Sequence, residues 1–322
     1  GISVEETEPE KTLAIIETSE VSAPIEERIW KSEKKKTEIE SRDVVLYLSG
    51  ENKTETLALE EYIVGVLLAE TPSWYDNEAL KACAVAARTY TLYKGNSSHP
   101  LGADVCDNPS HCQAFYTLSD AALAWNEKSA ESAEEKIREA VWETRGEILT
   151  CEGKPILAVY HASSYLKTRS AKEVFGSEVA YLASVDVLHE DGENTTRSQR
   201  EFTLHEALLI LKNAGYLPRD NTSFELFCAK DADGFDGVRV VYDGGEAFIP
   251  SVKVRSLFSL KSPSFTVTLT DDKLVFDVFG YGHGVGLSQN GANILAQNGF
   301  SYEEILSSYY KGAQLSILKN HE

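Results

Sequence analysis

The stretch from Leu59 to Pro72 constrains the fold of this chain more than any other. Its apolar residues recur at the spacing of one helical face and are Ile63, Val66 and Leu67. The next position on that face is Glu70, so a carboxylate closes an apolar stripe. Pro72 cannot donate a backbone hydrogen bond and disfavours helical geometry in the residue before it. The sequence therefore predicts that the helix ends at or just after Glu70.

A carboxyl group at the C-terminal end of a helix has an unusual electrostatic environment. The negative end of the helix dipole and partial removal from water both disfavour the ionised form, so we expect the pKa of Glu70 to be raised. A general acid that works near neutral pH needs such a pKa. The alternative is a glutamate at the rim of the core with its head in water, and most glutamates in this pattern are of that kind.

The composition is that of a large, acidic globular chain. It has 322 residues, which is enough for one large core or two domains. Its 31 basic and 51 acidic residues give a formal net charge of −20, which argues against nucleic acid as a partner. No apolar run predicts a transmembrane helix. The chain opens at Gly1 and contains no methionine, so we expect that an N-terminal membrane anchor or signal has been removed.

The N-terminal part of the chain divides into three segments. Residues 1–42 are rich in Glu, Lys, Ser and Thr and predict a solvated stalk. Two β-rich runs, residues 43–49 and 54–59, predict a hairpin that leads into the first helix. Asp76 is a good N-cap for a second helix that runs to Lys94.

Lys81 and Arg88 lie two turns apart on this second helix and therefore point the same way. One interpretation is ordinary solvated charge, although Val85 and Leu92 share the same side. The other interpretation is a pair of cations that line a groove near Glu70.

The loop over residues 98–116 gathers side chains that bind metals. The candidate ligands are His99, Cys106, His111 and Cys112. Thiolate and imidazole are ligands that zinc prefers, and four of them can close a tetrahedral structural site. A disulfide between Cys106 and Cys112 is the competing interpretation, and free thiols are a third. The chain has five cysteines, so at least one is free or bound to metal unless two chains pair.

The rest of the chain predicts a mixture of helices and short antiparallel strands. Helices are expected over residues 119–143, with Trp125 on the buried side, over 203–215 and after a capping box at 301–304. Short strands are expected over residues 146–149, 156–161, 181–185, 238–242, 246–249, 265–270 and 276–279. We therefore expect an α+β fold of two lobes with a cleft between them. Residues 43–195 plus 263–322 would form the catalytic lobe, and residues 196–262 a smaller inserted α/β lobe.

A glycine-rich stretch follows the last of these strands. Glycines occupy alternate positions from Gly280 to Gly286, which brings the backbone close to another group. The spacing is not the dinucleotide fingerprint and no βαβ unit surrounds it, so we discount a phosphate-binding loop. Three polar side chains remain, His283, Ser288 and Gln289, and we expect them to line a substrate groove.

Together these segments resemble the stage II sporulation protein D family, which is related to the amidase enhancers of bacterial cell walls. The resemblance runs from about Val44 to Gly312. The segments that carry it are Glu61–Pro72, Ala79–Tyr90, Ala103–Gln113 and Gly282–Gln289.

The resemblance implies an activity and residues for it. Members of the family are lytic transglycosylases, which cut the bond between N-acetylmuramic acid and N-acetylglucosamine and leave a 1,6-anhydro sugar. The family's single acid and base falls on Glu70, and its basic groove positions fall on Lys81 and Arg88. One of its tyrosines falls on Tyr181. In clostridial members the Cys and His loop binds zinc, so the resemblance favours a structural zinc in this loop.

The resemblance also implies a place and partners. It predicts action on the glycan strands of peptidoglycan during engulfment in sporulation. The expected location is the outer face of the cytoplasmic membrane, in the space between mother cell and forespore. The expected protein partners are stage II sporulation protein P, a peptidoglycan amidase and endopeptidase, and the membrane scaffold stage II sporulation protein M. Nucleic acid is not expected as a partner.

Two positions depart from the family pattern. Thr71 stands where the family usually has methionine, which we interpret as a packing change. A Ser-x-Gly-Gly stretch expected after His161 reads Ser163-Ser164-Tyr165-Leu166. The loss of both glycines predicts a change in the shape of the cleft wall.

Two other functions compete with the transglycosylase interpretation. The first is a non-catalytic wall-binding protein that stimulates a peptidoglycan amidase. The second is a zinc hydrolase that uses the Cys and His loop.

Overall fold

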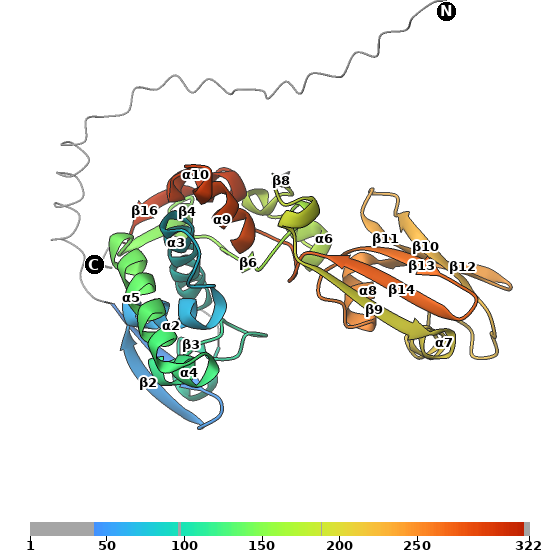
Figure 1. Ribbon diagram of the computed structural model, residues 1–322, viewed down its shortest axis with the longest axis horizontal. Helices are drawn as coiled ribbons and strands as arrows, with labels where there is room; N and C mark the ends of the chain where they lie inside the picture. The colour runs from blue at the N-terminus through green and yellow to red at the C-terminus, as the bar shows by residue number, and fades with distance from the viewer. Residues whose placement is uncertain (1–41, 96–97, 188, 319–322) are drawn as a thin grey trace, which may run out of the picture. The chain divides into compact units, whose positions relative to one another are not determined.

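The computed structural model describes residues 42–95, 98–187 and 189–318 (Figure 1). The predicted stalk over residues 1–42 therefore lies outside the described residues, except for Arg42. Within the described ranges, no helix is both long and apolar enough to span a membrane. The chain folds as a mixture of helices and short strands in small sheets, which confirms the α+β class.

The first sheet joins the predicted hairpin to the Cys and His loop. Strand β1 (Asp43–Leu48) pairs antiparallel with β2 (Lys53–Ala58), and β3 (Val105–Cys106) adds in parallel to the other edge of β1. The carboxylate of Asp104 accepts a hydrogen bond from the backbone amide of Val45 over 2.8 Å, which fixes the approach of this loop. The loop is thus anchored to the sheet at Cys106.

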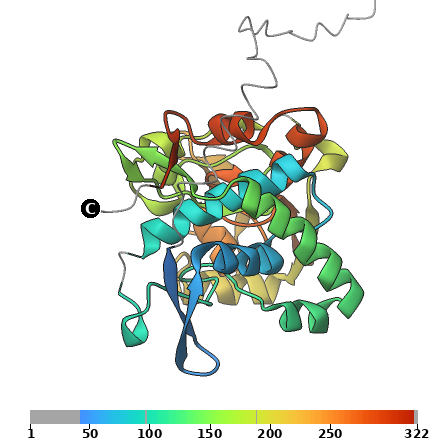
Figure 2. The ribbon, with the colours of Figure 1, turned by 90° about the vertical axis from the view of Figure 1, so that its left-hand side faces the viewer.

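Three helices pack against one another in the first hydrophobic core (Figure 2). They are α2 (Leu59–Glu70), α3 (Asn77–Lys94) and α5 (Glu127–Glu143). Asp76 caps α3 as predicted, because its side chain accepts a hydrogen bond from the amide of Glu78.

The long helix predicted over residues 119–143 is two helices. Helix α4 (Leu118–Ala124) ends at Trp125, and α5 begins after the N-cap Asn126. Because the break comes at Trp125, its ring is 42% exposed, and the prediction that it is buried was wrong.

The C-terminal part of the chain completes the first core. Strands β4 (Glu147–Cys151), β5 (Lys154–Pro155) and β16 (Gln314–Ile317) form one sheet, and β6 (Tyr160–His161) pairs in parallel with β15 (Leu287–Ser288). Helices α9 (Gln289–Gln297) and α10 (Tyr302–Tyr309) follow, and α10 begins with the predicted capping box of Ser301 and Glu304. A 3-10 turn over Ala180–Leu182 replaces the strand predicted at 181–185.

A second hydrophobic core is built from two three-stranded sheets and two helices. The sheets have the order β10-β11-β12 and β13-β14-β9. The strands are β9 (Arg197–Thr203), β10 (Glu225–Lys230), β11 (Asp236–Tyr242), β12 (Gly245–Pro250), β13 (Ser264–Leu269) and β14 (Lys273–Phe279). The helices are α7 (Leu204–Asn213) and α8 (Ser251–Leu257).

The buried residues of the second core run from Ala207 to Val278. The hairpin of β13 and β14 therefore packs in this core, whereas the sequence placed residues from 263 onward in the catalytic lobe. Strand β14 also pairs with β9 at its other edge, which joins this hairpin to the rest of the second core.

Residues from segments 165–186 and 228–279 line a cavity of about 480 Å³, among them Arg169, Asp236 and Phe279. Arg169 forms ion pairs with Glu173 and Asp236 at this place and donates to the carbonyl oxygen of Pro263 over 3.1 Å. Glu70 is not among the residues that line this cavity. The candidate site around Glu70 is therefore a different cavity, formed within the first core.

Candidate active site

Glu70 is the last residue of helix α2, as the sequence predicts. The amide of Thr71 still donates to the carbonyl oxygen of Leu67 over 2.9 Å, but Thr71 itself has the extended backbone that a residue before proline favours. The helix therefore stops with the Glu70 carboxyl group at its negative end.

A glycine in α2 brings a distant segment close to Glu70. A Cβ atom at Gly65 would lie 2.2 Å from the ring of Phe115, so only glycine lets the chain at residues 115–116 pack this close to the helix. The amide of Tyr116 donates to the carbonyl oxygen of Gly65 over 3.0 Å, and the rings of Tyr62 and Phe115 stack 5.6 Å apart. This packing places the backbone of Ala114 next to the Glu70 carboxylate.

The Glu70 carboxyl group is half-buried and hydrogen-bonded. The amide of Ala114 donates to Oε1 over 2.6 Å, and the Tyr160 hydroxyl is a second hydrogen-bond partner. Burial raises the pKa of Glu70 above the ordinary value of a glutamate, while the hydrogen bonds from Tyr160 and Ala114 lower it. Burial outweighs the hydrogen bonds, so the net shift has the direction predicted from the sequence.

Glu70 lines a cavity of about 300 Å³ that the first core forms around it. The other lining side chains that bear on its chemistry are Tyr90, Gln113, Tyr160, Phe175 and His283. The Tyr160 hydroxyl has one proton, which it can donate either to Oε1 of Gln113, 2.9 Å away, or to the Glu70 carboxyl group, and Nε2 of Gln113 donates to the Thr91 hydroxyl over 3.0 Å. One wall of the cavity is therefore a fixed chain of polar groups.

His283 lies in this cavity, where the sequence expected it. Its Nδ1 accepts a hydrogen bond from the amide of Val285 over 3.0 Å, so that nitrogen carries no proton. Burial, reinforced by the charge of Arg255, lowers the pKa of His283 to about 4. The imidazole is therefore neutral at pH 7 and acts as a hydrogen-bonding group rather than a cation.

The alternating glycines let the loop after β14 pack against strand β6. Gly286 has a φ of +72°, and a Cβ atom there would lie 2.0 Å from the carbonyl oxygen of Val159. The group that the backbone approaches is thus the protein's own chain at Val159, the residue before β6. The close approach aligns β15 with β6, which brings His283 and Tyr160 into the same cavity.

Ser288 and Gln289 lie behind the cavity and do not line it. Ser288 is fully buried and caps α9, since its hydroxyl accepts a hydrogen bond from the amide of Gly291. Gln289 donates from Nε2 to the backbone carbonyl oxygen of Glu70 over 3.1 Å and to the Thr71 hydroxyl over 3.0 Å. The sequence analysis expected both side chains to line a substrate groove, whereas both are buried where α9 begins. Gln289 instead fixes the end of α2.

Lys81 and Arg88 share one face of α3, as predicted, but that face packs against α5 and β4. Arg88 is fully buried, and its Nη2 lies 2.5 Å from Oε2 of Glu60 and donates to the carbonyl oxygen of Val141. Lys81 pairs with Glu78 and Glu143. Arg88 therefore cannot line a groove, and neither cation is among the described residues that line the Glu70 cavity.

Tyr181 also lies outside the lining of the Glu70 cavity. Its hydroxyl accepts a hydrogen bond from the amide of Leu157 over 3.2 Å. The contact holds the chain just before β6 and gives Tyr181 a structural partner.

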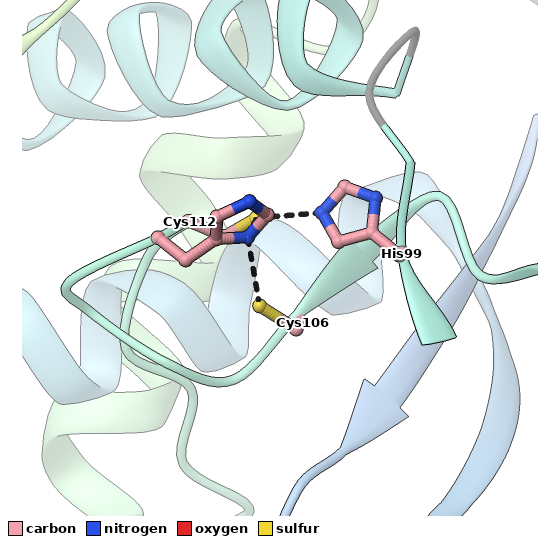
Figure 3. Close-up of side chains that lie close together, drawn as sticks. His99, Cys106 and Cys112 are labelled. Carbon is pink, nitrogen blue, oxygen red and sulfur yellow. Dashed lines mark hydrogen bonds between the residues drawn. The ribbon is translucent and has the colours of Figure 1, made fainter. Parts of the chain in front are cut away.

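The Cys and His loop brings its four candidate ligands together, and Figure 3 labels three of them, His99, Cys106 and Cys112. The ligand atoms of His99, Cys106, His111 and Cys112 all lie within 4.8 Å of one another. Nε2 of His99 lies 3.0 Å from Sγ of Cys112, and Nδ1 of His111 lies 3.4 Å from Sγ of Cys106. Both cysteines are free thiols, so the predicted alternative of a disulfide between them is not formed.

This donor set fits a metal ion with a preference for sulfur and nitrogen. A turn at Asn108 sets the spacing, because the amides of His111 and Cys112 both donate to its carbonyl oxygen. Two thiolates and two imidazoles match the ligands of a closed, tetrahedral zinc site. The same loop continues into Gln113 and Ala114, so it also forms part of the wall around Glu70.

The residues that stand in place of the Ser-x-Gly-Gly stretch include one with a left-handed backbone conformation, which usually favours glycine. Leu166 stands at the second glycine position and has a φ of +60°. Tyr165 stands at the first, and its ring stacks on Phe279 at a centroid distance of 4.5 Å.

Tyr160, Gln113 and the Ala114 amide are site groups that sequence reasoning did not identify. Tyr160 lies at a predicted strand and has no spacing to a partner that a pattern could detect. Gln113 and Ala114 directly follow Cys112, so their position next to the metal-ligand segment was the available signal.

Comparison with known proteins agrees with the resemblance drawn from the sequence. The family model described as stage II sporulation protein matches residues 47–151, which include Glu70 and the Cys and His loop. Stage II sporulation protein D of Bacillus subtilis (strain 168) is 30% identical over 277 residues, covering 85% of this chain and 78% of that protein. The same protein of Bacillus amyloliquefaciens is 29% identical over 276 residues, with the same coverage.

A more distant relative is the amidase enhancer of Bacillus subtilis (strain 168). It is 26% identical over 300 residues, covering 78% of this chain and 40% of that protein. The two stage II sporulation proteins D are covered over most of their length. With this coverage and the site geometry described above, the chain belongs to the stage II sporulation protein D family.

Proposed function

We propose that this protein is a lytic transglycosylase that cleaves the β-1,4 bond between N-acetylmuramic acid and N-acetylglucosamine in peptidoglycan. The observation that carries the proposal is the environment of Glu70. Its carboxyl group closes a helix, is half-buried in a cavity, and has a pKa raised by burial. A raised pKa favours the protonated form, which a general acid needs for the first step.

The proposed reaction uses Glu70 twice. Protonated Glu70 gives its proton to the glycosidic oxygen as the bond to the anomeric carbon breaks, and the N-acetylglucosamine side leaves with a new hydroxyl group. The 6-hydroxyl oxygen of the muramyl unit then bonds to the anomeric carbon and loses its proton to the Glu70 carboxylate. The products are a 1,6-anhydro end and a free glycan end, and Glu70 is again protonated.

The groups around Glu70 have distinct parts in this scheme. The Ala114 amide and the Tyr160 hydroxyl hydrogen-bond the carboxyl group and stabilise its ionised form after the first proton transfer. Neutral His283 offers a hydrogen-bonding group to sugar hydroxyls without adding charge. Gln289 holds the helix end from behind and acts as a positioning residue.

The cavity offers one carboxylate. Among the described residues that line it, Glu70 is the only acidic one. Inverting hydrolases need a second carboxylate to activate water, and retaining hydrolases need one as nucleophile. An internal attack by the 6-hydroxyl needs neither, so this lining favours the transglycosylase over a hydrolase.

We assign zinc a structural part in this proposal. His99, Cys106, His111 and Cys112 would hold it, and four protein ligands leave no open coordination position for a substrate. The ion would stabilise the loop that carries Gln113 and Ala114. This arrangement disfavours the zinc hydrolase as a rival function.

The test is the mass of the products from purified glycan strands. Wild-type protein is expected to release ends that are one water molecule lighter than the hydrolysed ends. Glu70→Gln keeps the shape of the side chain but removes the acid, so the rate should fall by at least about 10²-fold. Glu61→Gln, on the same helix and paired with Arg138 at the surface, is the matched control. Release of anhydro ends by Glu70→Gln at the wild-type rate would disprove the assignment of the acid.

A second candidate function is favoured by the similarity to the amidase enhancer. In that case the protein would bind the wall and stimulate a peptidoglycan amidase without cutting glycan. An assay of amidase activity with wild-type and Glu70→Gln protein separates the two functions. Equal stimulation by both, with no anhydro ends from either, would favour the enhancer.

The setting of the proposed activity follows the family. We assign to this protein a part in engulfment during sporulation, at the outer face of the cytoplasmic membrane between mother cell and forespore. Stage II sporulation protein P and stage II sporulation protein M are the proposed protein partners. Copurification of the three from sporulating cells would test this assignment.

A further inference from the structure

A second cavity adjoins Glu70. It measures about 460 Å³ and is lined by the turn that follows α2, from Leu68 to Trp74, together with Trp125 and Ser129. Among the described residues, Glu70 alone lines both this cavity and the one that holds Tyr160 and His283. Glu70 therefore lies where two hollows meet.

Two exposed tryptophans line this second cavity. Trp74 is 69% exposed and Trp125 is 42% exposed. Trp74 packs edge-on against Tyr75 at a centroid distance of 4.6 Å, and Tyr75 is itself buried. Trp125 is set at the corner between α4 and α5, where its amide donates to the carbonyl oxygen of Ala121 over 2.9 Å. Large apolar rings exposed together beside an acid are typical of a binding surface.

The chemistry of the lining favours a neutral ligand. Its described residues include no lysine or arginine, and Glu70 is its only charged group. An anionic ligand would find no cation here. A pyranose ring presents C–H groups that stack on the faces of tryptophan, and its hydroxyls can bond to the two serines of the lining, Ser73 and Ser129.

A protein that cuts inside a polymer must bind sugar on both sides of the bond that breaks. We infer that Trp74 and Trp125 form a sugar-binding subsite for the neutral N-acetylglucosamine unit, on the opposite side of the scissile bond from the cavity of Tyr160 and His283. The inference rests on the proposed function for the position of the bond at Glu70. The muramyl unit then occupies the Tyr160 and His283 cavity, and the leaving glycan chain extends over the two tryptophans.

The test measures binding apart from cleavage. In the Glu70→Gln background, binding of the β-1,4-linked N-acetylglucosamine tetramer is measured by calorimetry. Trp74→Ala and Trp125→Ala should each weaken it by about five- to tenfold, the effect of losing one stacked ring. Trp74→Phe and Trp125→Phe, which keep a ring, should retain most of the affinity.

Trp142 provides a matched control. It is 41% exposed and lies on α5, where it stacks with Arg145, and it lines neither cavity. Trp142→Ala should leave the affinity for the tetramer unchanged. Thermal unfolding of all variants checks that the fold is retained.

The outcomes separate this inference from the proposed function. If Trp74→Ala and Trp125→Ala bind the tetramer as tightly as Trp142→Ala, or if the parent protein does not bind it, the subsite is disproved. The release of anhydro ends by the active protein would still stand. If binding depends on both tryptophans while the active protein releases no anhydro ends, the sugar site holds and the transglycosylase fails.

Discussion

The amide of Ala114 lies 2.6 Å from Oε1 of Glu70, and this hydrogen bond joins the Cys and His loop to the candidate acid. Ala114 follows Cys112 by two residues, so the position of the loop and the position of the carboxyl group are linked. Burial nevertheless dominates the environment of Glu70 and raises its pKa.

The raised pKa of Glu70 predicts a dependence of stability on pH. Because the folded protein favours the protonated form more than the unfolded chain does, Glu70 destabilises the fold as pH rises through the range between its unfolded and folded pKa values. The free energy of unfolding of wild-type protein relative to Glu70→Gln should therefore be lower at pH 8 than at pH 4. Urea unfolding of both proteins at several pH values measures it.

A second buried glutamate, Glu190, does not affect this comparison. Glu190 is fully buried and its pKa is also raised by burial, but it contributes equally to both proteins and cancels. Glu61→Gln should show the pH dependence of the wild type. A difference between wild type and Glu70→Gln that does not change with pH would contradict the prediction.

Tyr160→Phe removes a hydroxyl that stabilises the ionised form of Glu70. The pKa of Glu70 should rise further, so the decline of activity at high pH should move to higher pH. The maximal rate should fall roughly 10- to 100-fold, the effect of losing a hydrogen bond to a charged group. Release of anhydro ends as a function of pH measures both effects.

Tyr181→Phe is the control for this variant. Its hydroxyl bonds to the Leu157 amide outside the cavity, so the pH profile should remain that of the wild type. An identical shift in both variants would show that the effect does not pass through Glu70.

The Cys and His loop should bind one zinc ion per chain. Elemental analysis of purified protein measures the metal content, which Cys112→Ser should reduce. Removal of zinc by a chelator should lower the midpoint of thermal unfolding, because a ligand that binds only the folded state stabilises it. Cys228→Ser changes an exposed thiol far from the cluster in sequence and should keep the metal. Equal metal content in all three proteins would contradict the assignment.

Arg88→Met should lower the free energy of unfolding. It leaves the buried carboxylate of Glu60 without its partner, and the loss of one member of a buried ion pair costs about 3–5 kcal/mol. The double variant Glu60→Gln with Arg88→Met should recover part of this loss. Lys81→Met, at a more exposed pair, should cost no more than about 1 kcal/mol. Urea unfolding measures all three, and a stable Arg88→Met protein with weakened glycan binding would instead favour the groove role.

Features set by neighbouring residues were predictable from the sequence. The end of α2 at Glu70 follows from Pro72, and the start of α3 follows from Asp76. The metal-ligand cluster lies within fourteen consecutive residues, from His99 to Cys112, so its members could be grouped without a fold.

Features set by distant partners were not predictable. The helical period placed Arg88 on the correct face of α3, but it could not show that Glu60 meets it there. The glycine pattern indicated a close approach, but the approaching strand at Val159 lies more than 120 residues earlier in the chain. Tyr160 enters the site only through that pairing.

The hydrogen bond from Gln289 to the carbonyl oxygen of Glu70 spans 219 residues of sequence. In a nascent or partly unfolded chain that lacks this contact, Gln289 no longer holds the end of α2. The Glu70 carboxyl group then lacks the buried environment that raises its pKa. Local opening of the C-terminal segment should therefore silence the protein before its global structure is lost. Under the proposed function, activity on glycan strands would then require the complete fold.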